Sequence, residues 1–223
     1  DCWPLLTLRD ITDRLRARND DFFLVASYGR ILPAELIKLP RLGTINIHPS
    51  LLPSYRGPSP IQTAILNGDR RSGVSIMMVT ERVDAGPILA SQPLAISPDA
   101  DTAELSKQLA EVGAVLFCRI LPRWLAQELA PQAQDESSAT YTQKITAARG
   151  QINLADEPIK NYRTFLALHQ EPGVYFYARN QKSKIPVKIN RASFSDGQFI
   201  IREVTPAGKR MMPWEDFKRG YRV

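Results

Sequence analysis

The chain has 223 residues, a hydrophobic fraction of 43% and a formal net charge of +6 at pH 7, which is typical of a soluble protein with one large core or two smaller ones. It has no apolar run of the roughly 18 residues that cross a membrane, and it does not open with the basic segment of a secretory signal. Its two cysteines, Cys2 and Cys118, fit neither a disulfide framework nor metal-ligand spacing, so we expect a cytoplasmic protein.

The first 130 residues alternate predicted helices and strands. Helical spacing of apolar residues, or a proline that can open a helix, predicts helices over residues 8–18, 33–37, 60–67 and 102–128. Short apolar runs predict strands over residues 22–26, 43–48, 74–79 and 88–96. Pro122 is expected to end or kink the last helix. This order of elements predicts an α/β domain.

The remaining residues follow a different pattern. Residues 131–140 are polar and have no periodicity, which predicts a linker. A short helix is expected over residues 158–169, and strands are expected over 174–177, 185–189 and 199–204. Short strands divided by turn residues are typical of a small β-barrel.

Charge is unevenly placed along the chain. Residues 1–141 carry 14 Lys and Arg against 16 Asp and Glu, a net of −2, whereas residues 142–223 carry 15 against 7, a net of +8. This asymmetry suggests that the first part carries out chemistry while the second holds an anionic partner. The alternative is a basic surface that only aids solubility.

Asn46, His48 and Asp84 are the candidates for chemistry. His48 is one of two histidines in the chain and follows Asn46 by two residues at the end of an apolar run. Because residues i and i+2 of a strand face the same way, an amide and an imidazole are expected to point to one spot, which suits acyl transfer. The alternatives are a structural histidine, a turn-forming asparagine and an aspartate that caps a loop.

The residues around this pair form a long motif, Asn46-x-His48-x-Ser50-Leu51-Leu52-Pro53-x-x-Arg56-Gly57, followed by Pro60-Ile61-Gln62 and Asp84-x-Gly86. Together with residues 26–33, 39–43, 141–145 and 206–211, the motif resembles the folate-dependent formyltransferases over nearly the whole chain. Within that family, the chain is most similar to the members that act on methionyl-tRNA.

The resemblance implies a Rossmann-like open sheet followed by an OB-like barrel. It places a catalytic domain at residues 1–130, a linker at 131–141 and a tRNA-binding domain at 142–223. It also implies that the N-terminal part of the catalytic domain is absent from this chain, so that the sheet is truncated and has an exposed edge.

The resemblance further implies transfer of a formyl group from 10-formyltetrahydrofolate to initiator methionyl-tRNA. The catalytic residues would be Asn46, His48 and Asp84, with Asn46 and His48 stabilising the oxyanion and His48, or a water held by Asp84, taking a proton from the amine. We expect a monomer that uses no metal and does not associate with a membrane. The alternative functions are formylation of an amino sugar nucleotide and a non-catalytic RNA-binding remnant.

Two further sets of residues are implied. The residues expected to bind folate are Tyr28, Gly29, Ile31, Leu32, Ser50, Leu51, Pro53, Thr80 and Val83. Those expected to contact tRNA are Arg56, Lys144, Lys182, Lys184, Lys188, Arg191, Lys209 and Arg210. For Arg56, pairing with a carboxylate is an equal alternative, and for Ile31 and Leu32 the alternative is ordinary core packing.

Overall fold

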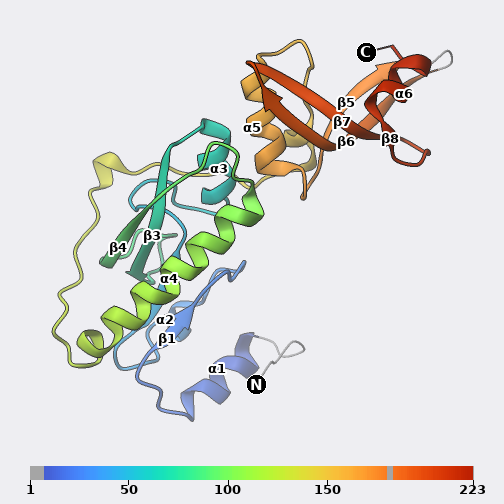
Figure 1. The fold of residues 1–223 in the computed structure, drawn as a ribbon. Helices are drawn as coiled ribbons and strands as arrows, with labels where there is room; N and C mark the ends of the chain where they lie inside the picture. Colours follow the sequence, from blue (N-terminus) through green and yellow to red (C-terminus); the bar gives the residue numbers. More distant parts are fainter. Residues whose placement is uncertain (1–7, 180–182, 223) are drawn as a thin grey trace. The chain divides into compact units, whose positions relative to one another are not determined.

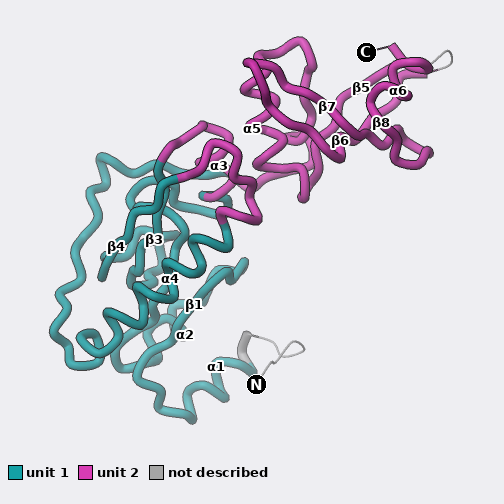
Figure 2. The backbone as a smooth tube through the Cα atoms, viewed as in Figure 1, with its two compact units in different colours: residues 1–60, 71–95, 106–143 teal, residues 61–70, 96–105, 144–223 magenta. Residues whose placement is uncertain are grey.

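The computed structural model describes residues 8–179 and 183–222, and it divides the chain into two compact units (Figures 1 and 2). The first unit comprises the chain up to residue 60 together with residues 71–95 and 106–143. The second comprises residues 61–70 and 96–105 and the chain from residue 144 onward. The first unit therefore contains all of the residues implicated above in chemistry.

The elements up to residue 125 lie close to those that the sequence predicts. The helices are α1 (Leu8–Arg16), α2 (Ala34–Ile37), α3 (Pro60–Asn67) and α4 (Thr102–Leu125). The strands are β1 (Phe23–Val25), β2 (Thr44–His48), β3 (Arg71–Met78) and β4 (Ile88–Ala95). Each predicted boundary is within about three residues of the observed one, which is the usual precision of pattern reasoning. Pro122 lies inside α4, which continues to Leu125.

The first unit contains a mixed four-stranded sheet in the order β1-β2-β3-β4. β1 runs parallel to β2, whereas β2 pairs antiparallel with β3 and β3 with β4. The register between β3 and β4 shifts at Ile76 and Met77, a bulge of the kind that often lies beside functional sites. The predicted α/β fold is thus confirmed.

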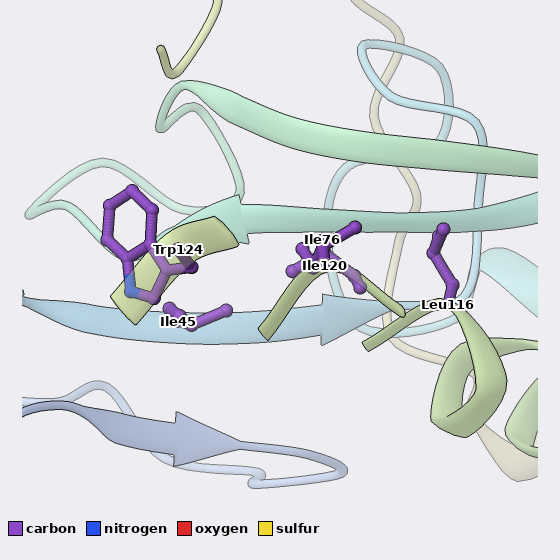
Figure 3. Packing of buried hydrophobic residues seen from close by; sticks show 5 residues of the cluster. All are labelled: Ile45, Ile76, Leu116, Ile120 and Trp124. Carbon is purple, nitrogen blue, oxygen red and sulfur yellow. The ribbon is translucent and has the colours of Figure 1, made fainter. Parts of the chain in front are cut away.

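One face of this sheet packs against α4. Ile45 from β2 and Ile76 from β3 contact Leu116, Ile120 and Trp124 of α4, and all five side chains are at most 8% exposed (Figure 3). The three helix residues are spaced by four, so they line one side of α4. Because β2 turns Ile45 toward α4, its alternate residues, Asn46 and His48, face away from this core.

The second unit contains a four-stranded antiparallel sheet in the order β5-β6-β7-β8. Its elements are α5 (Pro158–Leu168), β5 (Val174–Arg179), β6 (Lys184–Ser195), β7 (Gln198–Pro206), β8 (Met212–Pro213) and α6 (Trp214–Gly220). β6 and β7 form a hairpin whose two-residue turn has positive φ at both Asp196 and Gly197. That is the conformation favoured by an Asp-Gly pair in a tight hairpin.

Three features of this unit differ from expectation. β6 has 12 residues rather than the predicted five, and neither β8 nor α6 was predicted. The described strands do not close into a barrel, because β5 and β8 stand at opposite ends of the sheet order, so an OB-like barrel is not confirmed. Here a helix follows the last strand, and it is held to the sheet by Phe217, whose ring lies 5.9 Å from that of Phe176.

Two short 3-10 helices complete the described elements, η1 (Glu136–Ser138) and η2 (Ala147–Gly150). η1 lies within the predicted linker and is capped by Asp135, whose side chain accepts a hydrogen bond from the Ser137 N–H. None of the helices in the described part of the chain has both the length and the apolar character needed to cross a membrane.

The packing of α4 on the sheet yields a stability prediction. Leu116→Ala should lower the free energy of unfolding by about 2–5 kcal/mol, because it leaves a cavity in a closed core. Val115→Ala is the matched control, since Val115 is 60% exposed on the same helix and should change stability by no more than about 0.5 kcal/mol. Urea unfolding measures both variants, and equal losses would contradict this description of the core.

Candidate active site

β2 delivers Asn46 and His48 to one face of the sheet. Ile45 and Ile47 occupy the alternate positions and pack with the α4 core. Gly113 of α4 permits this close approach, since a Cβ built there would lie 2.9 Å from Ile47 Cγ2. On the opposite face, the Thr44 hydroxyl donates to the Ile37 carbonyl. The alternation predicted from the sequence therefore places the two polar side chains away from the core.

His48 is held between a carbonyl and a carboxylate. Its Nε2 lies 3.0 Å from the Tyr55 carbonyl oxygen, and its Nδ1 lies 3.6 Å from Asp84 Oδ2, with the imidazole 5% exposed. A carbonyl oxygen can only accept, so Nε2 carries a proton. Nδ1 therefore faces the carboxylate, either as a lone pair or, in the imidazolium, as a second donor.

Asp84 occupies a constrained turn after β3. Its φ is 48°, in the left-handed region, which an aspartate tolerates better than most residues. Its Oδ2 accepts a 2.8 Å hydrogen bond from the Gly57 N–H, and the described residues supply no hydrogen bond to its Oδ1. Gly86 allows the turn to close, since a Cβ there would lie 1.8 Å from the Met78 carbonyl oxygen.

Ser75 of β3 holds the loop after β2 through two hydrogen bonds. This fully buried serine donates to the Ser50 carbonyl at 2.8 Å and accepts from the Leu52 N–H at 3.0 Å. The Ser50 hydroxyl itself donates to the Ser54 carbonyl. The loop that carries the Tyr55 carbonyl to His48 is thus tied to β3 at two points.

Arg56 is buried in the same loop, with a side-chain exposure of 0%. Its five N–H groups donate to the Gln134 amide oxygen twice, to the two Glu136 oxygens and to the Tyr141 hydroxyl, at 2.8–3.2 Å. No N–H group is left over for a phosphate. This structure favours the alternative, pairing with a carboxylate, and a contact of Arg56 with tRNA stays a prediction.

Glu136 joins two arginines. Besides its contacts with Arg56, it accepts a 2.6 Å hydrogen bond from Arg82, which lies two residues before Asp84. The hydrogen bonds from Arg56 and Arg82 lower the pKa of Glu136 to about 2, and the bond to Glu136 raises the pKa of Arg56. Charge-assisted bonds of this kind are the stronger class of hydrogen bond.

Residues 132–143, expected to belong mostly to a linker, run along the first unit and bond to its loops. Gln132 exchanges backbone hydrogen bonds with Ile88, the first residue of β4. Thr140 and Thr142 bond to the backbone on either side of Arg56. We refer to residues 132–143 as the strap.

The strap holds three polar groups that the sequence did not reveal, namely Gln134, Glu136 and Thr140. Neither periodicity nor a motif marks them, because their partners lie on distant loops. Tyr141 belongs to the segment 141–145 that resembles the family. The one available signal was Arg56 itself, since an arginine among apolar and small residues needs partners if it is buried.

The residues expected to bind folate lie on three loops. Tyr28, Gly29, Ile31 and Leu32 lie between β1 and α2, Ser50, Leu51 and Pro53 follow β2, and Thr80 and Val83 follow β3. Ile31 and Val83 are 79% and 55% exposed, so the alternative of core packing does not hold for Ile31. A 2.8 Å ion pair from Lys38 to Glu81 joins the end of α2 to the loop after β3. Ser50 is buried.

The other residues expected to contact tRNA belong to the second unit, and those that are described are all exposed. Register places Lys188 opposite Tyr175 and Lys184 opposite Arg179. The Lys184 ammonium lies 4.8 Å from the centre of the Tyr177 ring. Arg191 lies 4.0 Å from Glu203, while Lys144, Lys209 and Arg210 lie outside the helices and strands. Lys182 lies outside the described residues.

The Glu136 contacts predict a pH dependence of stability. Because the folded pKa of about 2 lies below the usual 4.5, the carboxylate stabilises the folded chain fully above about pH 4.5, and this contribution is lost as the pH falls toward 2. Glu136→Gln should therefore unfold at a lower temperature than the parent at pH 7, and the gap should narrow below pH 4.5. A gap independent of pH would contradict this assignment, and Glu128→Gln, at an exposed carboxylate of the same unit, is the control.

Comparison with known proteins relates this geometry to one family. Residues 5–121 match the formyl transferase family. The chain is 36% identical to methionyl-tRNA formyltransferase of Roseiflexus castenholzii over 240 residues, covering 97% of this chain and 76% of that protein.

Solved structures share the fold. Methionyl-tRNA formyltransferase from Clostridium thermocellum superimposes with a TM-score of 0.68 at 23% identity, covering 87% of this chain and 81% of that one. HypX from Aquifex aeolicus, solved in complex with tetrahydrofolic acid, gives 0.70 at 19% identity, covering 93% and 40%. With a matched family over half of the chain and a relative at 36% identity over nearly all of it, this chain belongs to the formyl transferase family, among the relatives of methionyl-tRNA formyltransferase.

Proposed function

We propose that this chain transfers a formyl group from 10-formyltetrahydrofolate to the amino group of initiator methionyl-tRNA. The observation that carries the proposal is the placement of His48, buried and fixed between the Tyr55 carbonyl and the Asp84 carboxylate. Asn46 lies two residues earlier on the same face of β2. Membership of the formyl transferase family and the names of its relatives supply the reaction and the acceptor.

The reaction needs oxyanion stabilisation and proton transfer. The amine nitrogen attacks the formyl carbon, and the carbonyl oxygen gains a negative charge that the Asn46 amide and the His48 imidazole stabilise. The attacking amine loses a proton to His48 or to a water held by Asp84 Oδ1. The bond from the formyl carbon to the folate nitrogen then breaks, and that nitrogen takes up, through His48 or the water, the proton that the attacking amine gives up.

Folate is proposed to lie along the three loops that follow β1, β2 and β3. HypX, a protein of the same fold, is solved with tetrahydrofolic acid. The exposed apolar side chains of Tyr28, Ile31 and Val83 are suited to contact a pterin ring, since exposed apolar groups often mark ligand sites. Backbone groups of these loops would supply its hydrogen bonds. Ser50 would act by shaping the loop.

The second unit is proposed to bind tRNA, with the chain divided between catalysis in the residues up to about 141 and acceptor binding beyond. Residues 142–223 carry a net charge of +8. On one face of the sheet, Lys184 and Lys188 lie among Tyr175 and Tyr177, whose ring centres are 5.8 Å apart. Basic groups interleaved with aromatic rings suit a phosphate backbone with unpaired bases. An OB-like architecture for this unit stays part of the proposal.

The first test is His48→Ala in an assay of methionyl-tRNA formylation with 10-formyltetrahydrofolate. We expect kcat to fall by about 100- to 10,000-fold with an unchanged circular dichroism spectrum. His169→Ala, at the other histidine of the chain, is the control and should retain activity. Turnover by the His48 variant at the parental rate would refute its role in the chemistry.

Assays with other acceptors and measurements of folate binding separate the alternative functions. Formylation of an amino sugar nucleotide without formylation of tRNA would favour a sugar N-formyltransferase. Absence of folate binding by calorimetry, together with retained tRNA binding, would favour an RNA-binding protein without catalysis. The proposed function requires both folate binding and a tRNA product.

The second test concerns the salt dependence of tRNA binding. Lys184→Ala and Lys188→Ala should each lower the slope of log K against log salt concentration by about 1, because each removes a phosphate contact. Lys160→Ala, at an exposed lysine of α5 that pairs with Asp156, is the matched control and should leave the slope unchanged. Equal slopes for all three variants and the parent would remove this face from the proposed tRNA site.

A further inference from the structure

Gln134 of the strap links the two loops that meet at His48. Its amide oxygen accepts two hydrogen bonds from Arg56, at 3.0 and 2.8 Å. Its amide nitrogen donates to the backbone carbonyls of Asp84 and Gly86, at 2.9 and 2.7 Å. One side chain therefore uses both its donors and its acceptor to join the Arg56 loop to the Asp84 turn.

Thr140 of the strap holds the other partner of His48. Its hydroxyl oxygen accepts a 2.8 Å hydrogen bond from the Tyr55 N–H, and its carbonyl accepts one from the Arg56 N–H at 2.9 Å. Tyr55 has a positive φ of 60°, a conformation that a bulky residue adopts only when its surroundings impose it. The carbonyl that accepts from His48 Nε2 is thus oriented by the strap.

We propose that the strap positions His48 through both of its partners, with Gln134 fixing the Asp84 turn and Thr140 fixing the Tyr55 carbonyl. The inference rests on the proposed function, because it assigns positioning residues to the same site. Neither Gln134 nor Thr140 touches the imidazole itself. Each acts on the reaction only through the residue that it holds.

The geometry of Asp84 explains why such support matters. Its backbone lies in the left-handed region, and its Oδ2 is 3.6 Å from His48 Nδ1, slightly beyond a normal hydrogen bond. A small rotation of the turn would therefore either make or lose this contact. The two hydrogen bonds that the Gln134 amide donates to the carbonyls of Asp84 and Gly86 restrain that rotation.

The variant Gln134→Glu tests the positioning of the Asp84 turn while keeping the contact with Arg56. A carboxylate at this position still accepts from Arg56 but cannot donate to the carbonyls of Asp84 and Gly86. We expect kcat for formyl transfer to fall by about 10- to 100-fold, the size of a small displacement of reacting groups, while KM for both substrates stays within about twofold. Gln132→Ala is the control, since its side chain is exposed and only its backbone is paired.

A second readout does not depend on activity. Because the chain has only two histidines, the imidazole region of a ¹H–¹⁵N spectrum holds the signals of His48 and His169 alone. Gln134→Glu should move the His48 signals and leave those of His169 in place as an internal reference. Thr140→Val, which removes the hydroxyl at an exposed position with little change of shape, should also move them and lower kcat.

The outcomes separate this inference from the proposed function. If the two variants displace the His48 signals but the parent chain forms no formylated product, the positioning role stands and the proposed function is overturned. Unchanged kcat and unchanged His48 signals in both Gln134→Glu and Thr140→Val would overturn the positioning role. Should Gln134→Glu fail to fold, Thr140→Val alone decides by the same two measurements.

Discussion

The buried guanidinium of Arg56 is the constraint on which the first unit depends. A charge removed from water must be paired and fully hydrogen-bonded, or burial costs several kcal/mol. Arg56 meets this requirement only because Gln134, Glu136 and Tyr141 converge on it from one segment. The loop after β2 and the strap therefore adopt their conformations together, and the environment of His48 follows from that joint arrangement.

Two independent requirements shape β2. Its alternation sends Ile45 and Ile47 into the core beneath α4, and this burial fixes the strand in register. The same alternation leaves Asn46 and His48 on the opposite face, outside the core formed with α4. The hydrophobic core thus holds in place the strand that carries these two polar side chains, although they contribute little to that core.

The sequence was a good guide wherever the signal was local. The helix and strand periods of the first 125 residues and the i and i+2 spacing of Asn46 and His48 were both readable, because each depends on neighbours along the chain. The roles of Gln134 and Thr140 were not readable. Their partners lie 48–85 residues away, and a polar segment without periodicity has the same composition whether it is a free linker or a bonded strap. The helix α6 was missed for a similar reason, since it is short and its Phe217 packs against Phe176 of the distant strand β5.

The strap also bears on where this protein can be divided. Composition alone would favour cutting the chain near residue 130, where polar residues begin. A fragment ending there would retain Arg56 but none of the three side chains that receive its hydrogen bonds, and an uncompensated charge would remain in its interior. During synthesis, likewise, Arg56 can form all of its hydrogen bonds only after residue 141 has left the ribosome. The first unit can therefore be completed only after the strap has been made, a segment whose composition is that of a linker between two domains.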